Sequence, residues 1–346
     1  MFDLASAALE TARVRGAEYA DVRIGHYRKQ SISVRNGAPG PMSFSDSIGC
    51  GVRVIADGAW GFAASDRLDR EGVQRTAAQA VAIARTAAAA NVARVSRVPE
   101  PPAVDFWQTP LVVDPFAVPL EAKFDLLHRI DRILRGDPGN RIRVATGELA
   151  WQRRHTWLAS SEGSRIEQVR TITGAGYTVV AVADGEFQQR SYPNSFGRQS
   201  KSMGWELIAA LGLEANAERV REEAIELLTA PPCPSGKSDL IITGDQMVLQ
   251  IHESVGHASE LDRVLGHEAN YAGASFATTD KLGTFRYGSA IVNLVADTTV
   301  PTGLATMGYD DDGVAAQRWH IVRDGVLAGY MTNRETAGAV GQPRSR

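Results

Sequence analysis

Residues 48–66, IGCGVRVIADGAWGFAASD, have the pattern of a β-hairpin. Apolar residues occupy every second position of the first arm: Ile48, Cys50, Val52 and Val54. Such alternation is typical of a strand that buries one face. The pair Asp57-Gly58 then tolerates the positive φ angles of a tight turn. The segment predicts two antiparallel strands that meet at this pair.

The surrounding sequence extends the same architecture in both directions. Upstream, a strand-like run at residues 32–34 is closed by a second turn pair, Asn36-Gly37. Helical spacing of apolar residues predicts helices over residues 2–14 and 69–91, the second with an alanine-rich buried face. We therefore expect an α+β fold, with antiparallel sheets against which helices pack.

Prolines divide the chain into three expected domains. They interrupt residues 98–118 so often that we expect a loop there, acting as a linker. The domains are then an N-terminal α+β domain at 1–97, a middle α+β domain at 119–229 and a C-terminal domain at 230–346. The middle domain is expected to open with a helix after Pro119. The last begins with a short linker and an apolar strand at residues 240–242.

Composition excludes several classes of protein. Of 346 residues, 44% are hydrophobic and 22% charged, which is close to globular averages and unlike a disordered chain or a coiled coil. A net charge of −3 offers no basic surplus for nucleic acid. The sequence predicts neither a signal peptide nor a membrane span. Two cysteines cannot form a disulfide framework, so we expect a reducing compartment, the cytoplasm.

The chemistry of the chain is concentrated in residues 245–257, DQMVLQIHESVGH. Asp245 is a candidate N-cap for a helix that carries His252 and Glu253, with His257 following. Two neutral imidazoles can hold Zn²⁺, and a glutamate can take a proton from a water molecule activated by the metal. The candidate metal ligands are therefore His252 and His257, and the candidate catalytic residue is Glu253.

The spacing of the two histidines is unusual. Zinc peptidases commonly have H-E-x-x-H, in which the histidines lie about one α-helical turn apart. Here the interval is five residues, which on a regular α-helix turns the second imidazole by about 140° from the first. The motif works only if the helix widens or ends there, and a π-type turn aligns positions i and i+5. Gly256 is where we expect this distortion to be cheapest.

Simpler interpretations stay open for these and other residues. The histidines could be ordinary surface or core residues, since H-E-x-x-x-H alone is only moderately specific. The acidic run at residues 310–313, DDDG, could bind a hard cation, but a solvated turn is the default expectation. The pair His267-Glu268 is expected to be an exposed loop, and neither Cys50 nor Cys233 is well placed as a ligand.

The chain resembles the TldD/PmbA family, and specifically its TldD-type metalloprotease subunit. The resemblance rests on stretches in matching order that together span most of the sequence, with H-E-x-x-x-H itself a mark of the family. The partner-type subunit of the family lacks this motif. The four stretches are residues 48–66, 159–167, 230–263 and 308–338.

The resemblance implies a TldD/PmbA-like multi-domain architecture and a zinc-dependent peptidase. Its substrates would be small unfolded or extended peptides, and its partner a TldE/PmbA-type paralogous subunit or a second copy. In this resemblance, His252 and His257 match the metal ligands and Glu253 the general base. The alternative is a non-catalytic subunit that binds a peptide and presents it to a catalytic partner; a third possibility is hydrolysis of non-peptide amides. Fe²⁺, Co²⁺ and Mn²⁺ accept similar ligands.

One departure from the family concerns the third metal ligand. The resemblance implies a cysteine near the C-terminal end, but no cysteine follows Cys233 in this sequence. We expect either a C-terminally truncated chain with an incomplete last domain or coordination completed by His267, Glu260 or Asp262. With two ligands alone, the chain is expected to hold zinc weakly and to be inactive by itself.

Overall fold

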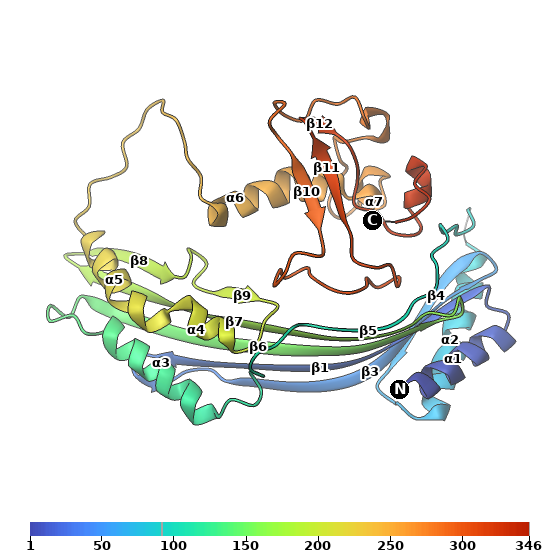
Figure 1. Ribbon diagram of the computed structural model, residues 1–346, viewed down its shortest axis with the longest axis horizontal. Helices are drawn as coiled ribbons and strands as arrows, with labels where there is room; N and C mark the ends of the chain where they lie inside the picture. Colours follow the sequence, from blue (N-terminus) through green and yellow to red (C-terminus); the bar gives the residue numbers. More distant parts are fainter. Residues whose placement is uncertain (91–92, 346) are drawn as a thin grey trace.

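The computed structural model describes residues 1–90 and 93–345 and is built around one long, curved sheet (Figure 1). Its strands are β1 Tyr19–Arg35, β2 Ala38–Pro39, β3 Ser43–Ala56, β4 Ala59–Ser65, β5 Val104–Gln108, β6 Ile142–Ser160, β7 Arg165–Ala183, β8 Glu186–Tyr192 and β9 Gln199–Lys201. The main order is β4-β3-β1-β6-β7-β5, and every pairing except β5 with β7 is antiparallel. The predicted α+β class, with antiparallel sheets and packed helices, is confirmed.

The predicted turns are confirmed by their backbone angles. Asn36 and Gly37 have φ values of 50° and 78°, and Asp57 and Gly58 have 53° and 79°. These left-handed pairs let the strands reverse with a twist that matches the sheet. Each pair joins neighbouring strands, β1 to β2 and β3 to β4.

One sheet receives strands from both the 1–97 range and the 119–229 range. Strand β1 has β3 along one edge and β6 along the other, so that Val22 lies between Val52 and Ala159. The hairpin of β6 and β7 therefore continues the N-terminal strands without a break. The hydrogen-bonded ladder joins these two parts of the chain directly.

The expectation of a loop throughout residues 98–118 is wrong for five of them. Val104–Gln108 forms β5, which pairs in parallel with β7 at the edge of the sheet. No proline occurs within these five residues, although Pro102 and Pro110 bracket them. Every residue of the strand therefore has an N–H group to donate. Because the strand lies at the edge of the sheet, the flanking prolines, which lack an N–H, do not interrupt the hydrogen bonding.

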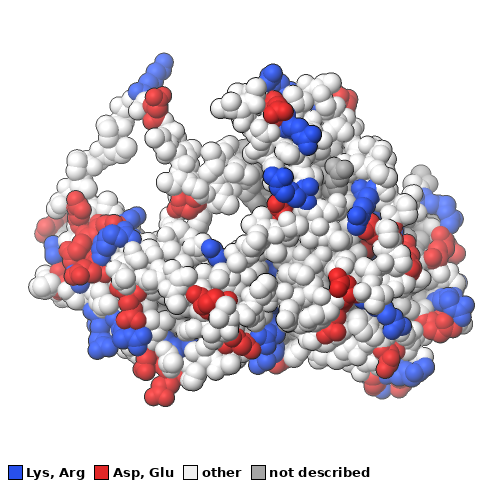
Figure 2. Space-filling model, viewed as in Figure 1, with Lys and Arg blue, Asp and Glu red and all other residues white. Residues whose placement is uncertain are grey.

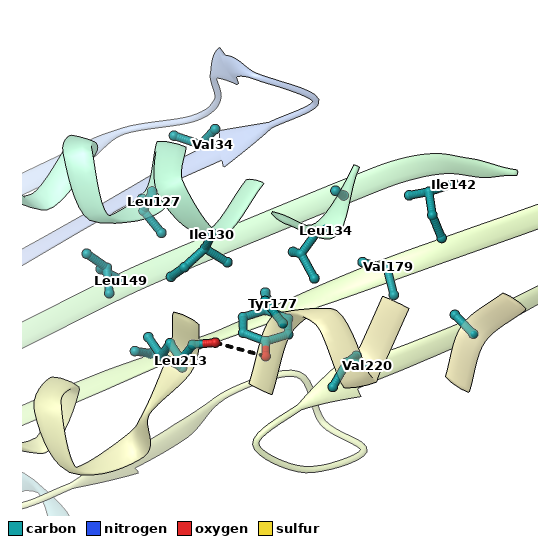
Figure 3. Packing of buried hydrophobic residues seen from close by; sticks show 14 of the residues in the cluster. Val34, Leu127, Ile130, Leu134, Ile142, Leu149, Tyr177, Val179, Leu213 and Val220 are labelled. Carbon is teal, nitrogen blue, oxygen red and sulfur yellow. Dashed lines mark hydrogen bonds between the residues drawn. The ribbon is translucent and has the colours of Figure 1, made fainter. Parts of the chain in front are cut away.

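Helices cover one face of the sheet. They are α1 Phe2–Val14, α2 Arg70–Ala88, α3 Leu120–Leu134, α4 Glu206–Leu211 and α5 Leu213–Glu226. The first matches its predicted bounds; α2 begins after the N-cap Asp69, and residue 91 of its expected range lies outside the described residues. Figure 3 shows one of the two resulting cores, in which α3 and α5 pack on the sheet and Tyr177 donates a hydrogen bond to the Leu213 carbonyl.

The opposite face of the sheet receives the C-terminal unit, residues 244–345. Its elements are α6 Gly244–Ile251, a π-helical turn His252–Gly256, 3-10 turns His257–Ser259, Thr279–Lys281 and Ala337–Val340, α7 Leu261–Val264 and the strands β10 Leu294–Asp297, β11 Arg318–Arg323 and β12 Val326–Leu327. The three strands form a small sheet with a core of its own. In Figure 1 this unit lies above the concave side of the long sheet.

The strand expected at residues 240–242 is not formed. Leu240 and Ile241 are 81% and 94% exposed, and the segment has no strand partner in the part of the chain that the structure describes. A strand needs a neighbouring strand to accept and donate its backbone hydrogen bonds. The apolar pattern of residues 240–242 alone was therefore not enough to predict a strand. The apolar positions of α6 are also not buried.

The acidic run at 310–313 joins the C-terminal unit to the long sheet, which corrects the expectation of a solvated turn. Asp312 accepts a hydrogen bond of 2.5 Å from the Arg53 guanidinium on β3, and Asp21 on β1 accepts another at 2.8 Å. The Asp312 side chain is 14% exposed, whereas that of Asp311 is 91% exposed. Asp311 alone behaves as the sequence predicted.

Candidate metal centre

The two candidate histidines are brought together by the π-helical turn. Helix α6 ends at Ile251, and the next five residues, His252–Gly256, form the turn. The imidazole rings of His252 and His257 then lie with centroids 4.3 Å apart at an interplanar angle of 75°. The wider π turn returns to the same side of the helix after about five residues, which aligns these two positions. The predicted distortion of the helix is confirmed.

Neighbouring side chains hold the turn in place. Val255 is buried in the core of the C-terminal unit, while the Tyr287 hydroxyl donates a hydrogen bond to the Ser254 carbonyl. Gly256 has φ −53° and ψ −70°, and a Cβ there would meet nothing closer than the Ile251 carbonyl at 3.8 Å. The turn therefore does not use the conformational freedom of glycine, because this backbone region is open to any residue.

The start of α6 differs from the sequence expectation. The helix begins at Gly244 with Thr243 at the N-cap, so Asp245 lies in the first turn. There its carboxylate accepts a hydrogen bond of 2.5 Å from the Thr243 hydroxyl, which lowers the pKa of Asp245. A carboxylate in the first turn stabilises a helix through its dipole.

Three side chains converge at the turn. His252, Glu253 and His257 each place one potential ligand atom within 4.8 Å of the other two. The Nε2 atom of His252 lies 3.8 Å from a carboxylate oxygen of Glu253. The side chains of His252, Glu253 and His257 are 57%, 61% and 32% exposed. The cluster is thus open to a metal ion and to a substrate.

Glu260 orients one of the histidines. Both of its carboxylate oxygens lie 3.2 Å from Nδ1 of His257. A carboxylate at Nδ1 favours the tautomer with the proton on that nitrogen and leaves Nε2 free to bind a metal. From the sequence, Glu260 was considered as an alternative metal ligand. Its position three residues after His257 is the sequence feature that could have predicted the orienting role.

The donor set fits a divalent transition metal. Two imidazole nitrogens and an adjacent carboxylate match the preference of zinc for nitrogen and oxygen ligands, and a histidine held by a carboxylate is usual at such sites. Among residues 1–90 and 93–345, no further histidine, cysteine or acid joins the cluster. Asp262 instead accepts a hydrogen bond from the Arg263 backbone at 2.9 Å, and His267 lies outside the cluster.

Sequence profiles identify the family. Residues 20–84 match PmbA/TldA metallopeptidase domain 1, residues 113–228 its central domain and residues 235–345 its C-terminal domain. These ranges follow one another in the family order and together cover most of the chain. The chain belongs to the TldD/PmbA metallopeptidase family.

Its relatives are named as metalloproteases. A metalloprotease of Methanocaldococcus jannaschii is 28% identical over 93% of this chain and 67% of the relative. A metalloprotease TldD homolog of Haemophilus influenzae is 24% identical over 94% of this chain and 65% of the relative. The chain therefore spans about two thirds of the length of these relatives.

Solved structures share the fold. A putative modulator of a DNA gyrase from Thermotoga maritima superposes with a TM-score of 0.76 at 17% identity, over 99% of this chain and 73% of that one. TldE from Thermococcus kodakarensis gives 0.71 at 15% identity, over 99% and 72%. At these identities the likeness concerns the fold. No described helix of the present chain is long and apolar enough to cross a membrane.

Proposed function

We propose that this chain is the metal-binding, catalytic type of TldD/PmbA subunit, a zinc-dependent peptidase for small unfolded or extended peptides. The observation that carries the proposal is the convergence of His252, Glu253 and His257 on a π-helical turn. The family profiles and the names of the relatives support a metallopeptidase.

Each residue of the cluster has a distinct part in the proposed reaction. His252 and His257 hold the metal, and Glu260 keeps the Nε2 lone pair of His257 available. The bound metal would polarise the scissile carbonyl and make a water molecule acidic. Glu253 lies beside this position and would hold the proton that the attacking water releases and donate it to the leaving amine, because a carboxylate can act as both base and acid.

The proposal also includes a setting and a partner. The two cysteines are free, Cys50 being buried and Cys233 exposed, which suits the cytoplasm. A TldE/PmbA-type subunit or a second copy of the chain would complete the assembly, since TldE has the same fold. Figure 2 shows the molecule hollowed beneath α6, between the C-terminal unit and the sheet, where an extended peptide has room to approach.

The test combines zinc binding with peptide cleavage. Zinc is titrated into the wild type, His252→Ala, His257→Ala and Glu253→Gln, with Glu226→Gln, an exposed position on α5, as the control. We expect the histidine variants to lose zinc and Glu253→Gln to keep it. Cleavage of unstructured peptides is then followed by mass spectrometry at added zinc, with and without a TldE/PmbA-type subunit. Glu253→Gln should be slower by roughly 10²- to 10⁴-fold.

Two outcomes would contradict the proposal. Normal cleavage by Glu253→Gln would remove this residue from the mechanism. Zinc and peptide binding without cleavage in either arrangement would instead favour the non-catalytic, peptide-presenting subunit.

A further inference from the structure

A cavity of about 780 Å³ lies between the long sheet and the C-terminal unit, and its lining does not include the metal cluster. The sheet forms its floor with the face that the helices leave uncovered, because side chains alternate along each strand. The C-terminal unit forms the opposite wall through residues 307–312, Asn333 and Glu335. The cavity is lined by five cations: Arg23, Arg53, Arg154 and Arg170 on the strands of the floor, and Arg97 in the segment before β5.

Three of these arginines have carboxylate partners. Arg53 pairs with Asp21 and Asp312, Arg23 with Asp21 and Asp311, and Arg97 with Glu162. Their charges are therefore balanced within the protein. Of the acidic residues that line the cavity, Asp311 and Asp312 are paired in this way.

Arg154 and Arg170 are different. They lie directly opposite each other in the register of β6 and β7, and both line the cavity. Across residues 1–90 and 93–345, neither forms an ion pair with a carboxylate. Like charges directly opposite on a sheet are destabilising, so the protein keeps this pair at a cost in stability.

The environment of Arg170 favours an anionic ligand. Its side chain is half-buried, and its Nε–H is shielded from solvent without a hydrogen-bond acceptor in the described part of the chain. Burial and the neighbouring Arg154 lower the pKa of the Arg170 guanidinium. A buried donor that lacks a partner costs free energy, and an anionic ligand would supply the partner.

We propose that Arg154 and Arg170 bind a carboxylate group of a peptide, carried by an acidic side chain or by the C-terminus. Side chains directly opposite on a sheet are about 5 Å apart at Cβ, so both guanidinium groups can reach one carboxylate. Each guanidinium can donate two parallel N–H bonds to it. This inference rests on the proposed function, which makes a peptide the ligand. It adds that the peptide carries a negatively charged carboxylate.

The remaining walls favour a peptide over a polyanion. Tyr27, Trp60 and Trp107 offer apolar surface for side chains next to the bound carboxylate. Glu335, on the opposite wall, forms no ion pair with any described residue and would repel a ligand with several negative charges, such as a polyphosphate or a nucleic acid. The cavity thus suits a single carboxylate at the arginine pair with uncharged groups around it.

The test measures binding of three hexapeptides by calorimetry and by the fluorescence of the cavity tryptophans. One contains glutamate and has an amidated C-terminus, the second has glutamine and a free C-terminus, and the third has glutamine and an amide. We expect the peptide without any carboxylate, the third, to bind at least tenfold more weakly than the first or the second. Whichever of these two binds more tightly shows whether the carboxylate comes from the glutamate side chain or from the C-terminus. The preferred peptide should lose at least tenfold in affinity with Arg154→Gln and with Arg170→Gln.

Two further variants separate the site from general charge and folding effects. Arg143→Gln removes an exposed arginine from the same strand, β6, outside the cavity, and should leave affinity unchanged. Arg170→Lys keeps the charge without the two-pronged geometry and should bind with intermediate affinity. Melting without ligand should occur at a higher temperature in Arg154→Gln than in the wild type, because the like-charge pair is gone.

Equal affinity for all three peptides, or unchanged affinity in Arg154→Gln and Arg170→Gln, would overturn the inference. So would a complete failure of the peptides to bind. Because the assay measures binding and not hydrolysis, charge-dependent binding without cleavage would leave the carboxylate site standing and contradict the peptidase proposal alone.

Discussion

Arg334 donates hydrogen bonds from Nη1 and Nη2 to both carboxylate oxygens of Glu162, at 2.6 and 2.9 Å. Glu162 belongs to the turn between β6 and β7, so the pair fastens the C-terminal unit to the end of the long sheet. The Arg334 side chain is 2% exposed and that of Glu162 38%. Arg334 also donates from Nε to the Val98 carbonyl at 3.0 Å.

Breaking this pair should destabilise the fold asymmetrically. Glu162→Gln leaves a buried guanidinium without its counter-charge and should lower the free energy of unfolding by about 3 kcal/mol. Arg334→Gln leaves a carboxylate that water reaches, and should cost less, about 2 kcal/mol. Urea unfolding followed by circular dichroism measures both. The exposed pair of Arg129 with Glu214 is the control: Glu214→Gln should change stability by at most about 1 kcal/mol.

Glu260→Gln should weaken zinc binding without removing a ligand. The neutral amide oxygen accepts the Nδ1–H bond of His257 more weakly than a carboxylate does, so less of the imidazole presents a free Nε2 lone pair. We expect a loss of ten- to a hundredfold in zinc affinity, measured by competition with a chelator. Glu268→Gln, which changes a carboxylate that pairs with Arg263, is the matched control. Equal affinities in the two variants would show that Glu260 does not act through His257.

Asp310 should make the protein less stable as the pH rises from about 4 to about 6. Burial raises the pKa of its carboxyl from the ordinary 3.8 to about 6, with Asp311 and Asp312 acting in the same direction. The folded state therefore binds this proton more tightly than the unfolded state. The contribution of Asp310 to the free energy of unfolding is therefore highest below pH 4, falls across this interval and is level above it.

Asp310→Asn should abolish that decline. One oxygen of Asp310 accepts both the Asp312 and the Val314 N–H at 2.8 Å, and an asparagine oxygen can accept the same two bonds. Above pH 6 the variant should be more stable by up to about 3 kcal/mol. Unfolding in urea at a series of pH values measures this, with exposed Asp239→Asn as the control. A decline that persists in Asp310→Asn would have to come from other groups.

Local chemistry explains what the sequence predicted well. The turn at Asp57-Gly58 and the helix at residues 2–14 depend on neighbouring residues, which the sequence displays side by side. The π-helical turn was also predictable, because the spacing of His252 and His257 allows convergence only on a wider turn. In each case the deciding interaction spans a few residues.

Long-range pairing explains what was missed. Arg154 and Arg170 become neighbours only through the register of β6 on β7, which no short pattern specifies. Residues 240–242 have a strand-like composition but no adjacent strand, and the pattern could not show that absence. Asp312 looked like part of a solvated turn because its partner Arg53 lies far away in the sequence.

The continuous sheet also constrains the order in which this protein can be made. One edge of β1 closes as soon as β3 has left the ribosome, but the other waits for β6, whose first residue, Ile142, is synthesised long after Arg35. Until then a seventeen-residue strand exposes its N–H and C=O groups to other chains. Each nascent protein therefore passes through an interval of vulnerability to aggregation, whose length depends on the speed of translation across residues 36–160.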